Sequence, residues 1–261
     1  MNAAMTAAPN SKVQLQERKR SGLITWKWPL LMSFARLVFA VLGQALVAGF
    51  YMLRGDPTPW QSAAPWWIVY GTLIDVGCLV LLVRLTRREG MRLVDLISYE
   101  RQRLGRDLLL AMGLLILSMV LFIGGGMILG LLIYGSSAAP LAMQPLPLWG
   151  SLYSLLIWPI IWALAEDMTY VGYALPRLEV LSGGAWLAVL VMSVGWGIQH
   201  IALPLIDWRW AAYRFAVPFV MGIVWSIFYL RTRRLLPFIV VHWAMDFSSV
   251  LMLVVLPMMA R

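Results

Sequence analysis

Four ionisable residues lie inside or at the edge of long apolar stretches of this 261-residue chain, and they are its best candidates for chemistry. They are Glu166, His200, His242 and Asp246. The chain has two histidines, and both belong to this set. Ionisable side chains are costly at bilayer depth, where they are usually partnered and functional. The set therefore predicts one shared functional site.

Asp167, directly after Glu166, is a fifth candidate, and the spacing of the acids limits which of them can face one site. His242 and Asp246 are four residues apart, so their side chains share one face of a helix. Glu166 and Asp167 are adjacent, and neighbouring side chains on a helix point about 100° apart. We therefore expect only one of these two acids to face the site squarely.

Two kinds of chemistry are open to these residues. Glu166, His200, His242 and Asp246 could bind a divalent metal such as zinc, since imidazole nitrogens and carboxylate oxygens are ordinary zinc ligands. Alternatively, a carboxylate acts as general base while imidazoles donate to a developing oxyanion, with no cofactor. The sequence has no HExxH or other compact zinc motif, and spacing alone does not choose.

The elements that must position these residues are membrane helices. The chain is 61% hydrophobic and 13% charged, with a mean hydropathy of +0.79. That is more apolar than a typical soluble domain, and the apolar runs are too long for barrel strands. We predict an all-α polytopic membrane protein with about seven transmembrane helices. Their expected positions are near 29–53, 65–85, 107–134, 148–170, 185–205, 212–231 and 235–257.

The segments outside this core have their own predicted structures. Residues 1–28 are expected to form a partly disordered cytoplasmic tail, followed by the first two spans within 29–85. In 86–106, leucine and isoleucine recur at roughly helical spacing among charged residues. This pattern predicts an amphipathic helix on the cytoplasmic membrane surface, with a solvated helical linker as the alternative.

Basic residues indicate how the chain is oriented. Lys and Arg gather in the tail, in the second-to-third connection and in the sixth-to-seventh connection, whereas 135–147 has none. Arg209 and Arg214 go against this trend. The bias predicts a cytoplasmic N-terminus in a bacterial inner membrane, with lipids as surroundings. It also explains the net charge of +9, so nucleic acid is not an expected partner.

Three short motifs carry a resemblance to a known family. Residues 166–179 read Glu-Asp-Met-Thr-Tyr-Val-Gly-Tyr-Ala-Leu-Pro-Arg-Leu-Glu, Trp196 precedes His200 by four residues, and His242 precedes Asp246 by four. In this order the motifs resemble those of the CPBP family, which contains CAAX prenyl proteases and Abi-like, bacteriocin-processing intramembrane proteases. The resemblance covers roughly 90–257 and marks 107–257 as a CPBP-like intramembrane protease core.

The resemblance implies an intramembrane endopeptidase in which Glu166 activates water, assisted by His200. His242 and Asp246 would lie opposite, near the scissile carbonyl. An ionised Asp246 cannot donate to an oxyanion, so it would orient His242 or bind a metal. The implied substrate is a peptide or a lipidated peptide, cleaved near the cytoplasmic side.

Two positions depart from the family's first motif. Asp167 stands where a second Glu is usual, and Val171 stands where an Arg is usual. The missing Arg removes a cation that could pair with an acid. An inactive CPBP-like scaffold or immunity or regulatory protein is therefore the alternative. A weaker alternative is a proton-coupled transporter that uses Asp75, Glu166 and the two histidines.

Two other charged residues are expected to have structural rather than catalytic roles. Asp75 lies in the second predicted span, and we expect it to pair with Arg36 or Gln44 of the first. Arg177 is expected to mark the cytoplasmic end of a helix, with contact to a substrate carboxylate as the alternative.

Overall fold

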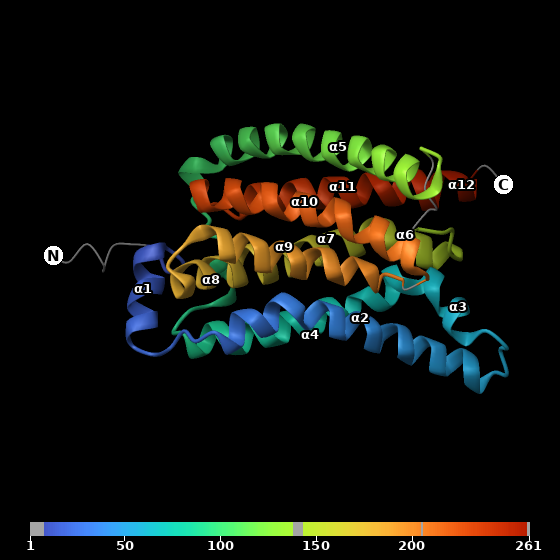
Figure 1. Cartoon of the computed structure of the whole chain (residues 1–261), viewed down its shortest axis with the longest axis horizontal. Coiled ribbons are helices and arrows are strands. Elements are labelled where there is room, and N and C mark those ends of the chain that lie inside the picture. Colours follow the sequence, from blue (N-terminus) through green and yellow to red (C-terminus); the bar gives the residue numbers. More distant parts are fainter. Residues whose placement is uncertain (1–7, 138–142, 205, 260–261) are drawn as a thin grey trace.

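The structure, a computed structural model, describes residues 8–137, 143–204 and 206–259. Within these residues all regular structure is helical, and the long helices run side by side along one direction (Figure 1). The α-helices are α1 (Lys12–Arg20), α2 (Lys27–Leu53), α3 (Pro59–Ala63), α4 (Trp67–Arg88), α5 (Leu104–Tyr134), α6 (Leu148–Leu156), α7 (Trp158–Asp167), α8 (Leu175–Ser182), α9 (Ala185–Ile201), α10 (Trp208–Thr232), α11 (Leu236–Val250) and α12 (Leu256–Met259).

Five helical stretches are long and apolar enough to cross a membrane, and they contain α2, α3–α4, α5, α10 and α11–α12. The bent pair formed by α6 and Trp158–Ser182, whose halves meet at 45°, gives a sixth. The remaining predicted span, α9, has only 17 residues and ends shortly before Pro204, which cannot continue a helix. The all-helical, multi-pass prediction is confirmed, with five or six candidate spans in the described chain where about seven were expected.

The helix that carries the first motif continues past it through a π-helical turn. This turn, η5 (Met168–Ala174), joins α7 to α8. Pro176 has no N–H to donate to the carbonyl of Gly172, four residues earlier. The side chain of Asn10 takes its place, because its Nδ2 donates to that carbonyl at 2.9 Å. The N-terminal tail thereby satisfies a backbone acceptor inside the helix.

The prediction of one amphipathic helix over 86–106 is wrong. α4 ends at Arg88, and two short 3-10 helices follow, η3 (Leu93–Leu96) and η4 (Arg101–Arg103). Gly90 and Ser98 both have a positive φ, which a continuous right-handed helix does not allow. Leu96 is fully buried, so the segment packs on the bundle.

The N-terminal tail is more ordered than predicted. Residues 1–7 lie outside the described residues, but α1 forms a helix whose N-cap, Ser11, accepts a hydrogen bond from the backbone N–H of Gln14. Leu15 is buried against Val180, and Lys12 lies 2.9 Å from a carboxylate oxygen of Glu179. α1 therefore docks on α8 across one end of the bundle (Figure 1).

A buried ion pair stabilises the end of the bundle where α1 packs on α8. Arg177 in α8 donates to the Glu89 carboxylate through Nε at 2.9 Å and through Nη2 at 2.5 Å. Its Nη1 donates to Asn10 and to the Tyr173 carbonyl, while the Tyr173 hydroxyl donates to Glu89. All these partners belong to the chain itself, which supports the structural reading of Arg177 over contact with a substrate.

We expect Arg177→Ala to lower the free energy of unfolding by about 3–5 kcal/mol, because it leaves the buried Glu89 carboxylate without its counter-ion. Lys12→Ala is the matched control, since half of the Lys12 side chain is exposed and such pairs contribute about 0–1 kcal/mol. Thermal unfolding in detergent measures both variants. Equal losses in the two would contradict the assigned role of Arg177.

Candidate active site

Glu166 and Asp167 are the last residues of α7, and neither is exposed at all. Their side chains leave the helix toward different neighbours, as the 100° spacing predicts. Glu166 faces α2, where it meets Arg36, and Asp167 faces α11, where it meets His242. One helical turn thus connects two separate polar clusters.

The first cluster is centred on Arg36 of α2, which is completely buried. Its Nη1 donates to Asp75 Oδ1 at 2.8 Å and its Nε donates to Gln199 Oε1 at 2.6 Å. Its Nη2 lies 3.2 Å from Glu166 Oε2. The guanidinium also lies over the Trp162 ring, 4.3 Å from its centre, where a cation is attracted by the π-face.

The second cluster is centred on His242 of α11. Its Nδ1 lies 3.2 Å from Asp167 Oδ1, and its Nε2 lies 3.6 Å from Asp246 Oδ2. An ionised carboxylate only accepts, so Nδ1 is the donor toward Asp167. Trp196 and Trp225 pack beside the imidazole, with ring centres 6.2 Å and 5.7 Å away. These contacts fix the ring and leave Nε2 directed toward Asp246.

His200, at the end of α9, is held by its own helix. Its Nδ1 lies 2.8 Å from the Trp196 carbonyl oxygen, four residues earlier. A carbonyl oxygen only accepts, so Nδ1 carries the proton of this hydrogen bond. The other ring nitrogen, Nε2, is therefore free to accept a hydrogen bond when the imidazole is neutral.

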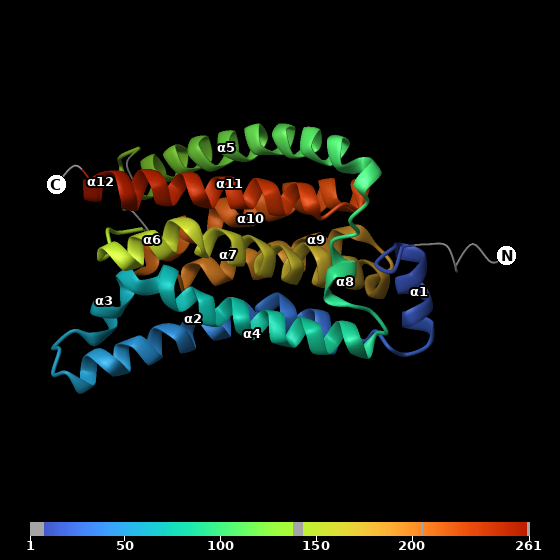
Figure 2. The same cartoon turned by 180° about the vertical axis from the view of Figure 1, so that it is seen from behind.

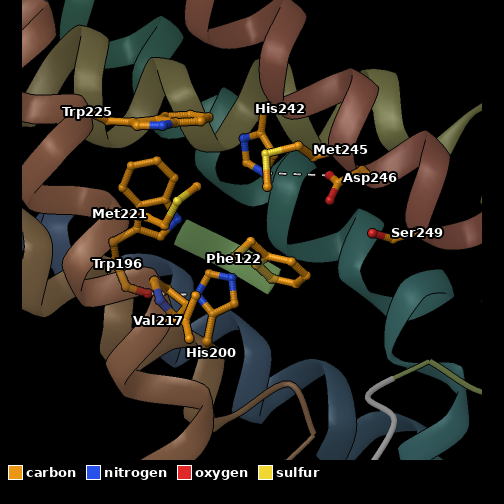
Figure 3. Close-up of a pocket in the computed structure, with 11 residues that line it drawn as sticks. Phe122, Trp196, His200, Val217, Met221, Trp225, His242, Met245, Asp246 and Ser249 are labelled. Carbon is orange, nitrogen blue, oxygen red and sulfur yellow. Dashed lines mark hydrogen bonds and ion pairs between the residues drawn. The ribbon is translucent and has the colours of Figure 1, made fainter. Parts of the chain in front are cut away.

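One cavity brings the polar residues of α9 and α11 together. It has a volume of about 220 Å³, and its lining includes His200, His242 and Asp246. Figure 3 shows a second, smaller pocket of about 80 Å³ that shares these three residues, with the two imidazoles on opposite sides and Asp246 beside His242. Glu166 is not among the lining residues, and both its oxygens are buried without a hydrogen-bond partner in the described chain.

Comparison with known proteins gives one match. Residues 148–248 match the family model for type II CAAX prenyl endopeptidases, Rce1-like. The chain carries an Rce1-like domain of the CPBP family. No curated protein and no solved structure matches the chain. The matched range contains all five predicted site residues, from Glu166 to Asp246.

Within the Rce1-like domain, Val171 occupies the usual Arg position and is fully buried. The cation that the motif lacks comes instead from Arg36, which lies outside the matched range. Arg36 was expected to pair with Asp75, and that pairing is confirmed. Its contact with Glu166 was missed, although an arginine inside the first apolar span was a signal for it.

Arg214 is a second residue that sequence reasoning missed. It was counted with the loop charges, but it lies in the second turn of α10 and lines the cavity of the Rce1-like domain. Its Nη2 donates to the Leu203 carbonyl at 3.3 Å. Its position, seven residues after Asp207, was the available signal, because it places the charge inside a candidate span.

The predicted metal ligands do not converge in the Rce1-like domain. Across the described residues there is no group of three or more His, Cys, Asp or Glu side chains placed to hold a metal ion. His242 has a carboxylate at each ring nitrogen, and Glu166 is beside a guanidinium, behind the cavity wall. This arrangement does not fit a shared zinc site.

The Arg36 cluster can be tested by a double-mutant cycle. We expect Arg36→Met to destabilise the protein by about 3–5 kcal/mol, because it leaves two buried carboxylates without a cation. Adding Asp75→Asn removes one of those charges and should recover part of the loss. Thermal unfolding of the wild type, both single variants and the double variant measures this coupling. Simple additivity of the two changes would argue against the shared cluster.

Proposed function

We propose that this chain is an intramembrane endopeptidase that hydrolyses a peptide bond in the cavity between α9 and α11. The observation that carries the proposal is the convergence of His200, His242 and Asp246 on one cavity, with Asp167 in contact with His242. All five residues belong to the Rce1-like domain, whose family is a peptidase family.

Glu166 is the proposed general base. Its Oε2 lies 3.2 Å from Arg36 Nη2, and an ionised carboxylate has further lone pairs with which to accept a proton from water. The water oxygen bonds to the scissile carbonyl carbon while its proton passes to Glu166, and the accepting nitrogen of His200 positions the water.

His242 is the proposed donor to the oxyanion. Asp167 holds Nδ1, and Asp246 orients Nε2, which in the protonated ring donates to the carbonyl oxygen as it gains charge. When the carbon–nitrogen bond breaks, the leaving amine takes a proton from Glu166. Each residue of the set then returns to its starting protonation state.

The lining and volume of the cavity also limit which part of a peptide substrate can enter it. Trp67, Phe122, Val217 and Leu253 contribute to an apolar lining around the polar groups. A volume of about 220 Å³ is below the range of about 300–1,000 Å³ typical of drug-sized ligand pockets. We infer that one or two apolar residues of the peptide enter the cavity while the rest stays outside.

The alternative function is a catalytically inactive scaffold. Two observations favour it, the apolar Val171 at the motif's Arg position and the pairing of Glu166 with Arg36 outside the cavity lining. In that case the same helices would bind a partner without cleaving it.

A cleavage assay in lipid nanodiscs separates the two functions. We expect wild-type protein to cleave members of a quenched fluorescent peptide library, and Glu166→Gln and His242→Ala to lower kcat/KM by about 10²–10⁴-fold. Glu17→Gln is the matched control, since Glu17 is an exposed acid on α1 that should be dispensable. Thermal unfolding of each variant checks that the fold is intact.

Cleavage at wild-type rates by both Glu166→Gln and His242→Ala would contradict the assignment of these two residues to the active site. Absence of cleavage by the wild type, together with a cellular function that survives Glu166→Gln, would favour the scaffold.

A further inference from the structure

The two ends of the helix bundle differ strongly in charge. Lys and Arg are concentrated in α1, in the connection 84–106 and in the connection 231–234. These segments gather at one end, whereas α3, the start of α6 and α12 lie at the other (Figures 1 and 2). At that second end the described residues include only two exposed basic side chains, Arg54 and Arg209. The positive-inside bias assigns the first end to the cytoplasm.

The cavity belongs to the half of the bundle with few charges. Trp67 and Trp210 line it from the N-terminal ends of α4, which follows α3, and of α10, which begins at the second end. Ser249 and Leu253 line it from the part of the last span that approaches the same end. Toward the basic end, the Trp196 and Trp225 rings pack edge to face at 5.1 Å behind the histidines.

We propose that the cavity is entered from the extracytoplasmic side, so that the substrate is a peptide segment in the outer half of the membrane or just outside it. This inference rests on the proposed function, and it replaces the sequence-based expectation of cleavage near the cytoplasmic side. At the basic end lie the buried pairs Arg177–Glu89 and Arg234–Asp107.

Single-cysteine labelling tests the side of access. The native thiol, Cys78, is buried and is removed by Cys78→Ala. Into this background we place Ser249→Cys in the cavity wall, Thr58→Cys at the exposed second end and Ser21→Cys at the exposed basic end. Bacterial cells with an intact inner membrane are treated with a membrane-impermeant maleimide, before and after permeabilisation.

We expect Thr58→Cys and Ser249→Cys to react in intact cells, and Ser21→Cys to react only after permeabilisation. Failure of Ser249→Cys to react in intact cells, or reaction of Ser21→Cys there, overturns the proposal. Labelling requires no turnover, so its result is independent of whether the protein cleaves peptides.

A separate observation concerns the guanidinium of Arg214. Its Nε is buried without a hydrogen-bond partner, and no carboxylate of the described chain forms an ion pair with it. The buried guanidinium groups of Arg36, Arg177 and Arg234 all have acidic partners. Arg214 is half-buried and lines the cavity, and a partly desolvated cation without a counter-ion is costly.

We infer that Arg214 binds a carboxylate of the peptide substrate, from either its C-terminus or an acidic side chain. A guanidinium suits this ligand because its planar N–H groups match the two carboxylate oxygens. Arg214 lies in the second turn of α10, which begins at the sparsely charged end, and its Nη2 donates to the Leu203 carbonyl, just beyond His200. An entering peptide would therefore meet Arg214 on its way to the imidazoles.

Binding of fluorescent peptides to Glu166→Gln protein tests this subsite without turnover. Peptides of one sequence are compared as C-terminal acid and amide, and with an internal Asp or Asn. We expect at least about a 10-fold preference for one acidic form over its neutral partner, since charge-assisted hydrogen bonds contribute about 1.5–3 kcal/mol. The form that is preferred identifies the source of the carboxylate.

Adding Arg214→Gln should abolish that preference, whereas Arg209→Gln, an exposed arginine on the same helix, should leave it unchanged. Equal binding of acidic and neutral peptides, or a preference that survives Arg214→Gln, overturns the assignment.

Discussion

The contact between the Arg36 guanidinium and its three polar partners determines how the acidic side of the site is assembled. Arg36 comes from α2, Asp75 from α4, Glu166 from α7 and Gln199 from α9, so one side chain connects four helices. A fully buried cation is tolerable only when its hydrogen bonds and charge are matched. A shift of any of these helices along its axis would separate the partners, so the cluster fixes their register at the depth of the site.

The different contacts of the two adjacent acids, Glu166 and Asp167, follow from this constraint. Because Arg36 holds Glu166 on the α2 side, Asp167 is directed to His242 on the α11 side. The apolar Val171 packs in the core one turn later, where the family usually has an arginine. The chain thus supplies a cation to its first motif from another helix, and the departure in the motif does not leave the carboxylate without a charge partner.

The sequence was sufficient to predict helices and the neighbourhood of the site, because apolar runs and short motifs are local signals. His200 and His242 on one cavity follow from such signals. The contact of Arg36 with Glu166 could not be predicted, since it depends on how α2 packs against α7. The failure at 86–106 has another cause. The spacing of its apolar residues suits both a helix and a chain wrapped on the bundle, and the positive φ angles of Gly90 and Ser98 exclude the continuous helix.

The hydrogen bond from Asn10 to the Gly172 carbonyl has a consequence for assembly of the chain. Its two residues are separated by 162 positions, and the carbonyl is available because Pro176 has no N–H. Asn10 also accepts from Arg177, so its native contacts can form only after the π-helical turn and α8 have been synthesised.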